Sequence, residues 1–282
     1  MKTNVIYNKD CRHMDEVEDG SVHLVCTSPP YNVGMEYNNE RPDRMALADY
    51  LAFTREWIAE AVRKLAPGGR IAINIANTGR KPYIPLNHHV VGICLDLGLL
   101  MFQEYIWNKG RAVAAGKTSW GTWRDARSPQ ARDCHEYIEV FCKPGHEINA
   151  KGDEDPYALP CEGYEKSKYL TGHDFALGSF SVWDIGPETS KKIKSVHPAP
   201  FPVELARRMI EFLTRPGQIV LDPFAGSAST WVACQTLPEP RRFIGYEINP
   251  DYVKFATRRV AKVTGPKLEI EKPKGLEAFA RG

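Results

Sequence analysis

Apolar residues follow two patterns along the chain: short continuous runs, and longer stretches with an apolar residue every three or four positions. The short runs predict buried strands at residues 22–28, 70–75, 104–108, 137–142, 218–221 and 243–247. The helical spacing predicts helices at residues 45–65, 90–97, 203–213, 229–235 and 251–263, the first of them ended by Pro67-Gly68-Gly69. Strands that alternate with amphipathic helices predict an α/β fold with a doubly wound, mostly parallel sheet.

One segment, residues 145–195, breaks this alternation. It is rich in Gly, Pro, Asp, Glu and Lys, has no clear periodicity, and is too long for a simple loop in a compact domain. Its aromatic residues argue against full disorder; they are Tyr157, Tyr164, Tyr169, Phe175, Phe180 and Trp183. We interpret the segment as an inserted recognition region between blocks at residues 1–144 and 196–265, with a C-terminal tail at residues 266–282.

The composition excludes several classes of protein. The chain has 282 residues and a formal net charge of +2, which is too small to indicate any partner. Its seven cysteines show no CxxC or other metal-like spacing, so we expect reduced thiols, a cytoplasmic location and no metal site. The N-terminus lacks the apolar core of a signal peptide, and the longest apolar stretch, residues 90–102, is too short to span a membrane.

Residues 219–230 read as a strand, a tight turn of small residues and a helix. Small residues let a ligand approach the backbone, and the helix offers unpaired N–H groups. The next strand ends in Glu247, 25 residues after Asp222, where an acid can accept hydrogen bonds from both ribose hydroxyls. The GxGxxG fingerprint and the Walker A lysine pattern are absent, so a nucleoside without a pyrophosphate fits better. Asp222 alone would be an ordinary turn or cap residue; in register with Glu247 it favours a nucleoside site.

The strand predicted at residues 22–28 leads directly into Thr27-Ser28-Pro29-Pro30-Tyr31. Two prolines fix two φ angles and remove two backbone donors, and each also restricts the residue before it. The result is a stiff backbone with bare carbonyls. Such a segment suits a site where a ligand meets acceptors in one geometry, and it equally suits an ordinary exit from a strand.

Basic residues gather between Trp107 and Arg132. The segment carries six of them against a single acid, Asp125, and two tryptophans lie among them; the basic residues are Lys109, Arg111, Lys117, Arg124, Arg127 and Arg132, and the tryptophans are Trp120 and Trp123. Basic residues with aromatics and glycines are typical of a loop that closes on a phosphate backbone. The alternative is a charged, solvated face.

Three segments together resemble the amino-DNA methyltransferases. LDPFAGSAST followed by FIGYEINPDYVKFATRRV is similar to the half of that family that binds S-adenosyl-L-methionine (SAM), and TSPPY resembles its catalytic [DNS]PP[YF] motif. HPAPFP, at residues 197–202, resembles the segment before the cofactor motif in the permuted, beta-type group. That group has the order found here: catalytic block, recognition region, cofactor block. The turn reads GSAST where many members have GSGTT.

The resemblance implies a Rossmann-like, SAM-dependent methyltransferase fold. It also implies cofactor contacts from Asp10, Thr27, Phe201, Asp222, Pro223, Phe224, Ala225, Gly226, Ser227, Glu247 and Asn249. Asp10 would meet the adenine edge of SAM, or else be a surface turn acid. Phe201 would pack by the methionine end. We interpret His197 as a loop histidine hydrogen-bonded to a neighbour.

The same resemblance implies that SPPY holds a base flipped out of duplex DNA. The Ser28 hydroxyl and the Pro29 carbonyl would accept the hydrogens of its exocyclic amine. Pro30 would keep the turn rigid, and Tyr31 would stack on the base. The freed lone pair would attack the methyl group directly and in line. Phosphate contacts are expected from Lys109, Arg111, Lys117, Trp120 and Arg124.

In the resembling family, SPP[YF] favours cytosine N4 and DPP[YF] favours adenine N6, so adenine N6 stays the alternative. Cytosine C5 chemistry needs a cysteine nucleophile, and Pro160-Cys161 follows the wrong strand. Methylation of protein glutamine and a DNA-binding protein without catalysis are further alternatives. The expected partner is double-stranded DNA. The enzyme would belong to a restriction-modification system or act alone. A homodimer is a possible assembly, and a cognate restriction endonuclease is a possible partner.

Overall fold

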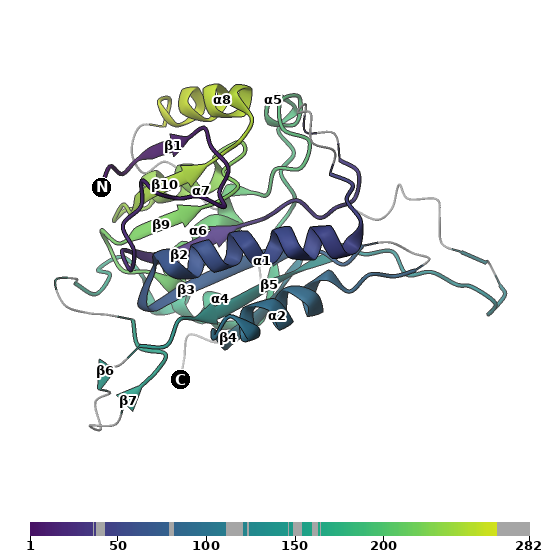
Figure 1. Cartoon of the computed structure of the whole chain (residues 1–282), viewed down its shortest axis with the longest axis horizontal. Coiled ribbons are helices and arrows are strands. Elements are labelled where there is room, and N and C mark those ends of the chain that lie inside the picture. The colour runs from purple at the N-terminus through teal and green to yellow at the C-terminus, as the bar shows by residue number, and fades with distance from the viewer. Residues whose placement is uncertain are drawn as a thin grey trace.

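The computed structural model describes residues 1–35, 37, 43–78, 82–110, 121–122, 124–145, 147–148, 154–159, 163 and 165–263. In these residues eight strands form one sheet in the order β1-β10-β9-β2-β3-β5-β4-β8 (Figure 1). Their bounds, in sheet order, are Val5–Tyr7, Arg242–Tyr246, Ile219–Asp222, Val22–Thr27, Leu65–Ile75, His135–Cys142, Leu100–Asn108 and Val182–Asp184. All neighbours pair in parallel except β5, which is antiparallel to both β3 and β4. The predicted mostly parallel α/β sheet is confirmed.

Helices cover both faces of the sheet. One face carries α1 (Leu47–Lys64) and α2 (Leu86–Asp96), and the other carries α6 (Val203–Leu213) and α7 (Ser229–Thr236) (Figure 1). The remaining elements are α4 (Gly172–Ser179), α5 (Lys191–Lys194), α8 (Pro250–Val260), and the two-stranded sheet of β6 (Glu147–Ile148) and β7 (Glu154–Asp155). None of the helices in the described ranges has both the length and the hydrophobicity needed to cross a membrane.

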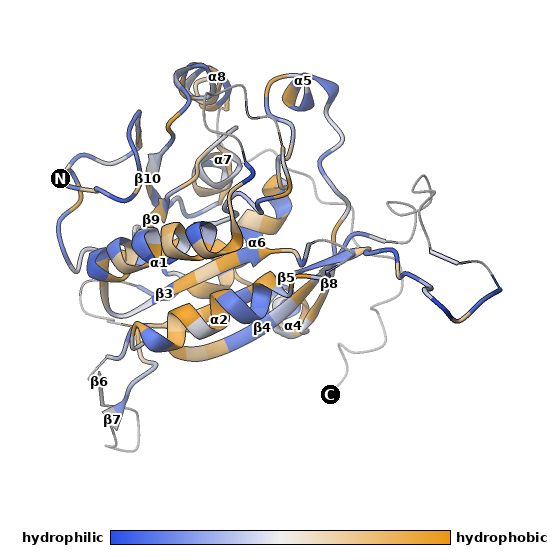
Figure 2. Ribbon diagram, turned by 45° about the vertical axis from the view of Figure 1, so that its right-hand side comes forward, coloured by the Kyte–Doolittle hydropathy of each residue, from blue (hydrophilic) through white to orange (hydrophobic). Residues whose placement is uncertain are grey.

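Strand β2 shows why its sequence is apolar without alternation. All six of its residues are buried, because the strand has helices on both faces. Val25 packs with Trp57 of α1 in one core cluster, whereas Leu24 packs with Leu205 of α6 in the other. Figure 2 shows the same arrangement as largely hydrophobic central strands between helices with one apolar face.

The boundary between α1 and β3 differs from the prediction. The helix ends at Lys64, and β3 begins at once with Leu65, so Pro67-Gly68-Gly69 lies inside the strand. Two backbone hydrogen bonds of 2.8 Å, from Gly68 N to Lys143 O and from Lys143 N to Gly69 O, explain the early start. Gly68 has φ +73°, and a Cβ there would lie 1.7 Å from the Ala158 carbonyl oxygen, so only glycine fits this close approach.

Part of the segment at residues 145–195 joins the main sheet. Strand β8 pairs in parallel with β4, and its Trp183 is buried, with its ring stacked on Tyr105 at 4.3 Å between centroids. The segment also contains α4, which the periodicity analysis did not predict. Thr171 and Asp174 form a capping box at its start, a signal that is visible in the sequence as Thr-x-x-Asp.

Candidate active site

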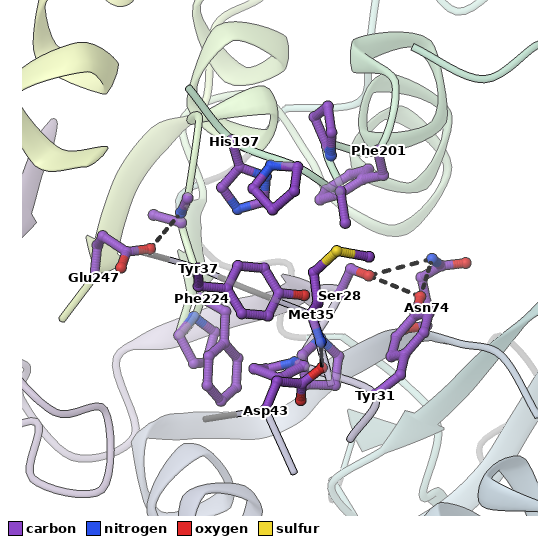
Figure 3. Close-up of a pocket in the computed structure, with 18 of the residues that line it drawn as sticks. Ser28, Tyr31, Met35, Tyr37, Asp43, Asn74, His197, Phe201, Phe224 and Glu247 are labelled. Atoms are coloured by element: carbon purple, nitrogen blue, oxygen red, sulfur yellow. Dashed lines mark hydrogen bonds between the residues drawn. The ribbon is translucent and has the colours of Figure 1, made fainter. Parts of the chain in front are cut away.

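A pocket of about 690 Å³ opens at the carboxyl ends of the central strands. Its walls include the segments that follow β1, β2, β9 and β10, and a residue near the end of β3. This is the edge at which ligands bind in doubly wound sheets. Figure 3 shows Glu247 on one side of the pocket and Tyr31 with Asn74 on the opposite side.

The Glu247 side is built from the turn after β9. The Glu247 carboxylate accepts hydrogen bonds from Gly226 N at 2.9 Å and from Asn249 N at 2.8 Å, one on each oxygen. Each oxygen keeps a lone pair for a further donor. Burial raises the pKa of Glu247 to about 7. This acid is therefore held in place by backbone amides, with spare acceptor capacity.

His197 lies in the pocket wall next to this turn. A Cβ at position 226 would come within 2.7 Å of His197 Nε2, so the imidazole covers Gly226 closely. The ring packs between Tyr252, at 4.9 Å, and Tyr37, at 5.8 Å. Burial lowers the pKa of His197 to about 4, so the ring is neutral at pH 7. Among the residues that the structure describes, Nδ1 has no hydrogen-bond partner, so the predicted hydrogen bond to a neighbour does not form at this nitrogen.

Three residues predicted to contact a cofactor do not line the pocket: Thr27, Asp222 and Asn249. The buried Asp222 carboxylate accepts from Thr27 Oγ1 at 2.7 Å, Thr230 Oγ1 at 2.6 Å and Phe224 N at 3.0 Å. Asn249 caps α8 through its side-chain oxygen, 2.9 Å from Asp251 N. These three side chains hold the turns behind the pocket wall.

The other predicted cofactor residues are all in the pocket wall: Asp10, Phe201, Pro223, Phe224, Ala225, Gly226, Ser227 and Glu247. Arg12 holds the Asp10 carboxylate with two of its nitrogens, at 2.8 Å and 3.1 Å. Phe224 meets Trp57 edge to face at 5.3 Å. The Phe201 carbonyl accepts from Ser229 Oγ at 2.8 Å, which ties the segment before α6 to the start of α7. Asp10 thus lines the pocket and also accepts from Arg12 N at 3.1 Å in the turn after β1, so its contact with the adenine edge stays a prediction.

The opposite side of the pocket is the Ser28-Pro29-Pro30-Tyr31 segment. Ser28 Oγ lies 2.9 Å from Tyr31 Oη, and the Pro30 carbonyl accepts from Tyr50 Oη at 2.8 Å. Within the described ranges no donor contacts the Pro29 carbonyl. A hydroxyl and a bare carbonyl therefore lie in the same pocket as the acid of the β10 turn. Nowhere in the described part of the chain do three or more His, Cys, Asp or Glu side chains gather as metal ligands would.

Comparison with known families identifies this arrangement. The N6_N4_Mtase family of DNA methylases matches residues 22–258, which spans both sides of the pocket. The chain belongs to this family.

Individual relatives of this DNA methylase align along most of its length. The type II methyltransferase M.BglII of Bacillus subtilis is 29% identical over 261 residues, covering 90% of this chain and 68% of the relative. The DNA adenine methyltransferase YhdJ of Escherichia coli K12 is 27% identical over 260 residues, which cover 91% of this chain and 82% of the relative. The structure of the putative DNA modification methylase TTHA0409 of Thermus thermophilus, solved in complex with SAM, superposes with a TM-score of 0.67 at 27% identity. The match covers 93% of this chain and 96% of TTHA0409. The last match confirms the predicted methyltransferase fold.

Two polar residues of this DNA methylase that the sequence analysis did not single out lie beside Ser28. Asn74, near the end of β3, and Glu136, in β5, both line the pocket and are buried. Asn74 is the one polar residue in the apolar run Ile71-Ala72-Ile73-Asn74-Ile75, and that interruption is the signal that could have marked it. Glu136 gives no comparable signal, because charged residues are frequent on both sides of it.

Asp43 is a third missed residue of the pocket wall. Its carboxylate accepts hydrogen bonds from the backbone N–H groups of Asn32 at 2.8 Å, Val33 at 3.1 Å and Met35 at 3.2 Å. These bonds fix the chain that follows SPPY along the pocket wall, which Val33 and Met35 also line.

The residues predicted to touch DNA are only partly described. Arg111, Lys117 and Trp120 lie outside the described residues. Lys109 lines the pocket, where its Nζ donates to Glu136 Oε1 and lies 4.5 Å from the centre of the Trp107 ring. Arg124 does not line the pocket. Lys109 therefore lies in the pocket wall, paired with Glu136, and its predicted phosphate contact stays a prediction.

Proposed function

We propose that this DNA methylase transfers a methyl group from SAM to the exocyclic N4 of cytosine at specific sites in duplex DNA. The observation that carries the proposal is the shared pocket: the Ser28 hydroxyl and the Pro29 carbonyl face the same cavity as Glu247 and the Gly226 turn. The first pair are acceptors suited to an amine, and the second group suits a nucleoside. A volume of about 690 Å³ is within the roughly 300–1,000 Å³ of ligand pockets.

The residues on the Glu247 side fit SAM. The free lone pairs of Glu247 suit the two ribose hydroxyls, and the lack of a side chain at Gly226 lets the ligand reach the backbone. Asp10 is suited to the adenine edge, and Phe201 to the methionine end. When bound, SAM supplies a methyl carbon on a positively charged sulfur, which the target amine attacks directly while the sulfur keeps the electron pair of the broken bond.

The residues on the Ser28 side activate the amine. Its lone pair is delocalised into the base, so it is a poor nucleophile. Ser28 Oγ and the Pro29 carbonyl accept its two hydrogens and draw it toward a tetrahedral geometry, which frees the lone pair. Tyr50, by binding the Pro30 carbonyl, helps to keep the turn rigid. The methylated nitrogen carries a positive charge and loses its proton readily, so no strong base is required.

The choice of cytosine rests on Ser28 in the first position of the motif, because the family pattern SPP[YF] favours cytosine N4. Adenine N6 is the alternative, and the similarity to YhdJ, whose name specifies adenine, favours it. The sequence disfavours cytosine C5 methylation by Cys161, because Pro160-Cys161 follows the wrong strand; Cys161 lies outside the described residues.

The remaining parts of the proposal concern partners. Residues 145–195 would read the DNA sequence, and the basic residues from Arg111 to Arg132 would bind phosphates, whereas Lys109 pairs with Glu136. The protein would act in the cytoplasm, alone or beside a cognate restriction endonuclease, as a monomer or a homodimer. The blocks at residues 1–144 and 196–265 would be the catalytic and SAM-binding halves.

The test is methyl transfer from SAM with a labelled methyl group to duplex DNA, followed by digestion to nucleosides. We expect label in N4-methylcytosine. Label in N6-methyladenine would establish the alternative, and label in 5-methylcytosine would contradict the Ser28 mechanism. If the protein binds SAM but labels none of a set of genomic DNAs, DNA methyl transfer is wrong.

A further inference from the structure

Beside Ser28 lies a chain of hydrogen bonds that ends on a buried carboxylate. Tyr31 Oη is 2.9 Å from Ser28 Oγ and 3.0 Å from Glu136 Oε2. Asn74 Nδ2 is 2.6 Å from the same Glu136 oxygen and 2.8 Å from Tyr31 Oη. Glu136 is 8% exposed, and Lys109 binds its other oxygen. This ion pair compensates the negative charge of the buried Glu136 carboxylate.

The chemistry of these groups fixes where each hydrogen points. An ionised carboxylate only accepts hydrogen bonds, so Tyr31 and Asn74 must both donate to Glu136. Tyr31 has one hydrogen and three acceptors within reach: Glu136 Oε2 at 3.0 Å, Ser28 Oγ at 2.9 Å and the Asn74 carbonyl at 3.2 Å. The charged oxygen of Glu136 is the strongest of the three, so it takes the hydrogen. Burial raises the pKa of the Tyr31 phenol, so that hydrogen is retained.

Ser28 therefore has a single arrangement left. Since Tyr31 Oη gives its hydrogen to Glu136, it can only accept from Ser28 at 2.9 Å. The Ser28 hydrogen then points to Tyr31 Oη, which leaves the Ser28 oxygen to accept a hydrogen bond from a group in the pocket. Asn74 Nδ2 also donates to Ser28 Oγ, at 3.3 Å, the longest of the hydrogen bonds in this cluster. This bond uses a lone pair of Ser28 and does not change the direction of the Ser28 hydrogen.

We propose that Glu136 is a positioning residue that sets the direction of the Ser28 hydroxyl and thereby makes the site selective for a base with an amine. This inference rests on the proposed function. A lone pair at Ser28 Oγ accepts an N–H of cytosine or adenine, whereas the keto oxygen of thymine, uracil or guanine at the same place meets another acceptor. Such a site rejects a keto base through a repulsive contact as well as through a lost hydrogen bond.

The experiment compares Glu136→Met, Glu136→Gln and the wild type, with Glu104→Met as a matched control on the neighbouring strand β4. The DNA is the duplex that the wild type methylates, with the target cytosine either intact or replaced by uracil. Two quantities are measured: kcat for methyl transfer to cytosine, and the ratio of DNA affinities for cytosine and uracil at the target.

Glu136→Met removes the strongest acceptor, so the Tyr31 hydrogen is shared between Ser28 Oγ and the Asn74 carbonyl, and the Ser28 hydroxyl is no longer held in one direction. We expect kcat to fall roughly tenfold to a hundredfold, the preference for cytosine over uracil to fall about tenfold, and the KM for SAM to stay unchanged. Glu136→Gln retains an oxygen for Tyr31 and should keep most of the preference. Glu104→Met should match the wild type.

The inference is overturned if Glu136→Met lowers kcat but leaves the preference for cytosine intact, because a packing role alone would do that. It is also overturned if Glu136→Gln loses the preference as fully as Glu136→Met, since the acceptor would then be irrelevant. A wild type that binds SAM and methylates no DNA refutes the proposed function, and the role of Glu136 falls with it.

Discussion

The Thr27 hydroxyl donates a 2.7 Å hydrogen bond to the Asp222 carboxylate, across 195 positions of the sequence. The two residues end strands β2 and β9, which lie side by side with Val25 opposite Leu221. Thr27 directly precedes Ser28, and Asp222 directly precedes the turn that contains Gly226. This buried bond therefore links the proposed methyl-accepting side of the pocket to the proposed SAM side.

Removing this bond should destabilise the fold and leave the pocket wall in place. Thr27→Val keeps the shape of the side chain but leaves the buried Asp222 with one donor fewer, so we expect the free energy of unfolding to fall by about 1–3 kcal/mol. Urea denaturation measures this. The control is Thr257→Val. The exposed Thr257 hydroxyl bonds only within α8, so its loss should change the free energy of unfolding by less than about 0.5 kcal/mol. Equal midpoints for the two variants would contradict the prediction.

Glu247→Ala should weaken SAM binding, because the ribose hydroxyls lose their acceptor. A hydrogen bond to a charged group contributes about 1.5–3 kcal/mol, so the affinity should fall about tenfold or more. Calorimetry with the folded variant measures this. An affinity equal to that of the wild type would remove Glu247 from the cofactor site.

SAM binding should also depend on pH through the same residue. Burial raises the pKa of Glu247 to about 7, so the carboxyl is increasingly protonated as the pH falls below that value. A protonated carboxyl loses acceptor capacity, and the affinity should therefore fall with decreasing pH, by up to about tenfold per pH unit. The comparison is with Glu247→Gln, which has no proton to gain. A wild-type profile parallel to that of Glu247→Gln would refute the assignment.

Ser28→Ala should abolish most methyl transfer and spare SAM binding. The hydroxyl is on the far side of the pocket from Glu247 (Figure 3), and its loss leaves the target amine with one acceptor instead of two. Single-turnover transfer and SAM calorimetry on the same preparation measure both effects. If the variant turns over normally, Ser28 is an ordinary strand exit.

Lys109 and Arg124 should behave differently in a salt titration of DNA binding. Arg124 is outside the pocket, and if it contacts a phosphate, Arg124→Ala should reduce the slope of log affinity against log salt by about one unit. Lys109 is bound to Glu136, so Lys109→Ala should lower the rate of methyl transfer with the salt slope unchanged. Lys117→Ala is expected to resemble Arg124→Ala. A reduced slope for Lys109→Ala would return Lys109 to the phosphate-binding group.

The sequence predicts the central strands well, because β2 and β9 are buried on both faces and read as continuous apolar runs. It misses the two edge strands, β1 and β8, which have three residues each. Helix α6 was predicted with its observed bounds, since Pro202 and a wide apolar stripe define it. The extension of β3 through Pro67-Gly68-Gly69 was missed, because it depends on hydrogen bonds to Lys143, which no local pattern reveals.

The site was predictable to a similar extent. Motif residues that follow strand ends, such as Ser28 and Glu247, reach the pocket because parallel strands end at one edge. Residues that act through their neighbours, such as Glu136 and Asp43, have no motif, and their proximity to Ser28 or to the segment after it arises from the fold. Thr27 and Asp222 adjoin motif residues yet point behind the wall, because successive side chains of a strand alternate in direction.

Strand β2 lies between β3 and β9 in the sheet, and the ribosome synthesises β9 much later than β3. A ribosome that adds roughly 5–20 residues per second takes about 10–40 s to travel from Thr27 to Asp222. During that interval the nascent chain exposes an apolar strand edge that invites pairing with other chains. The pocket itself is incomplete until Glu247 has been synthesised, so a growing chain that stops short of this residue lacks the acid proposed to hold SAM.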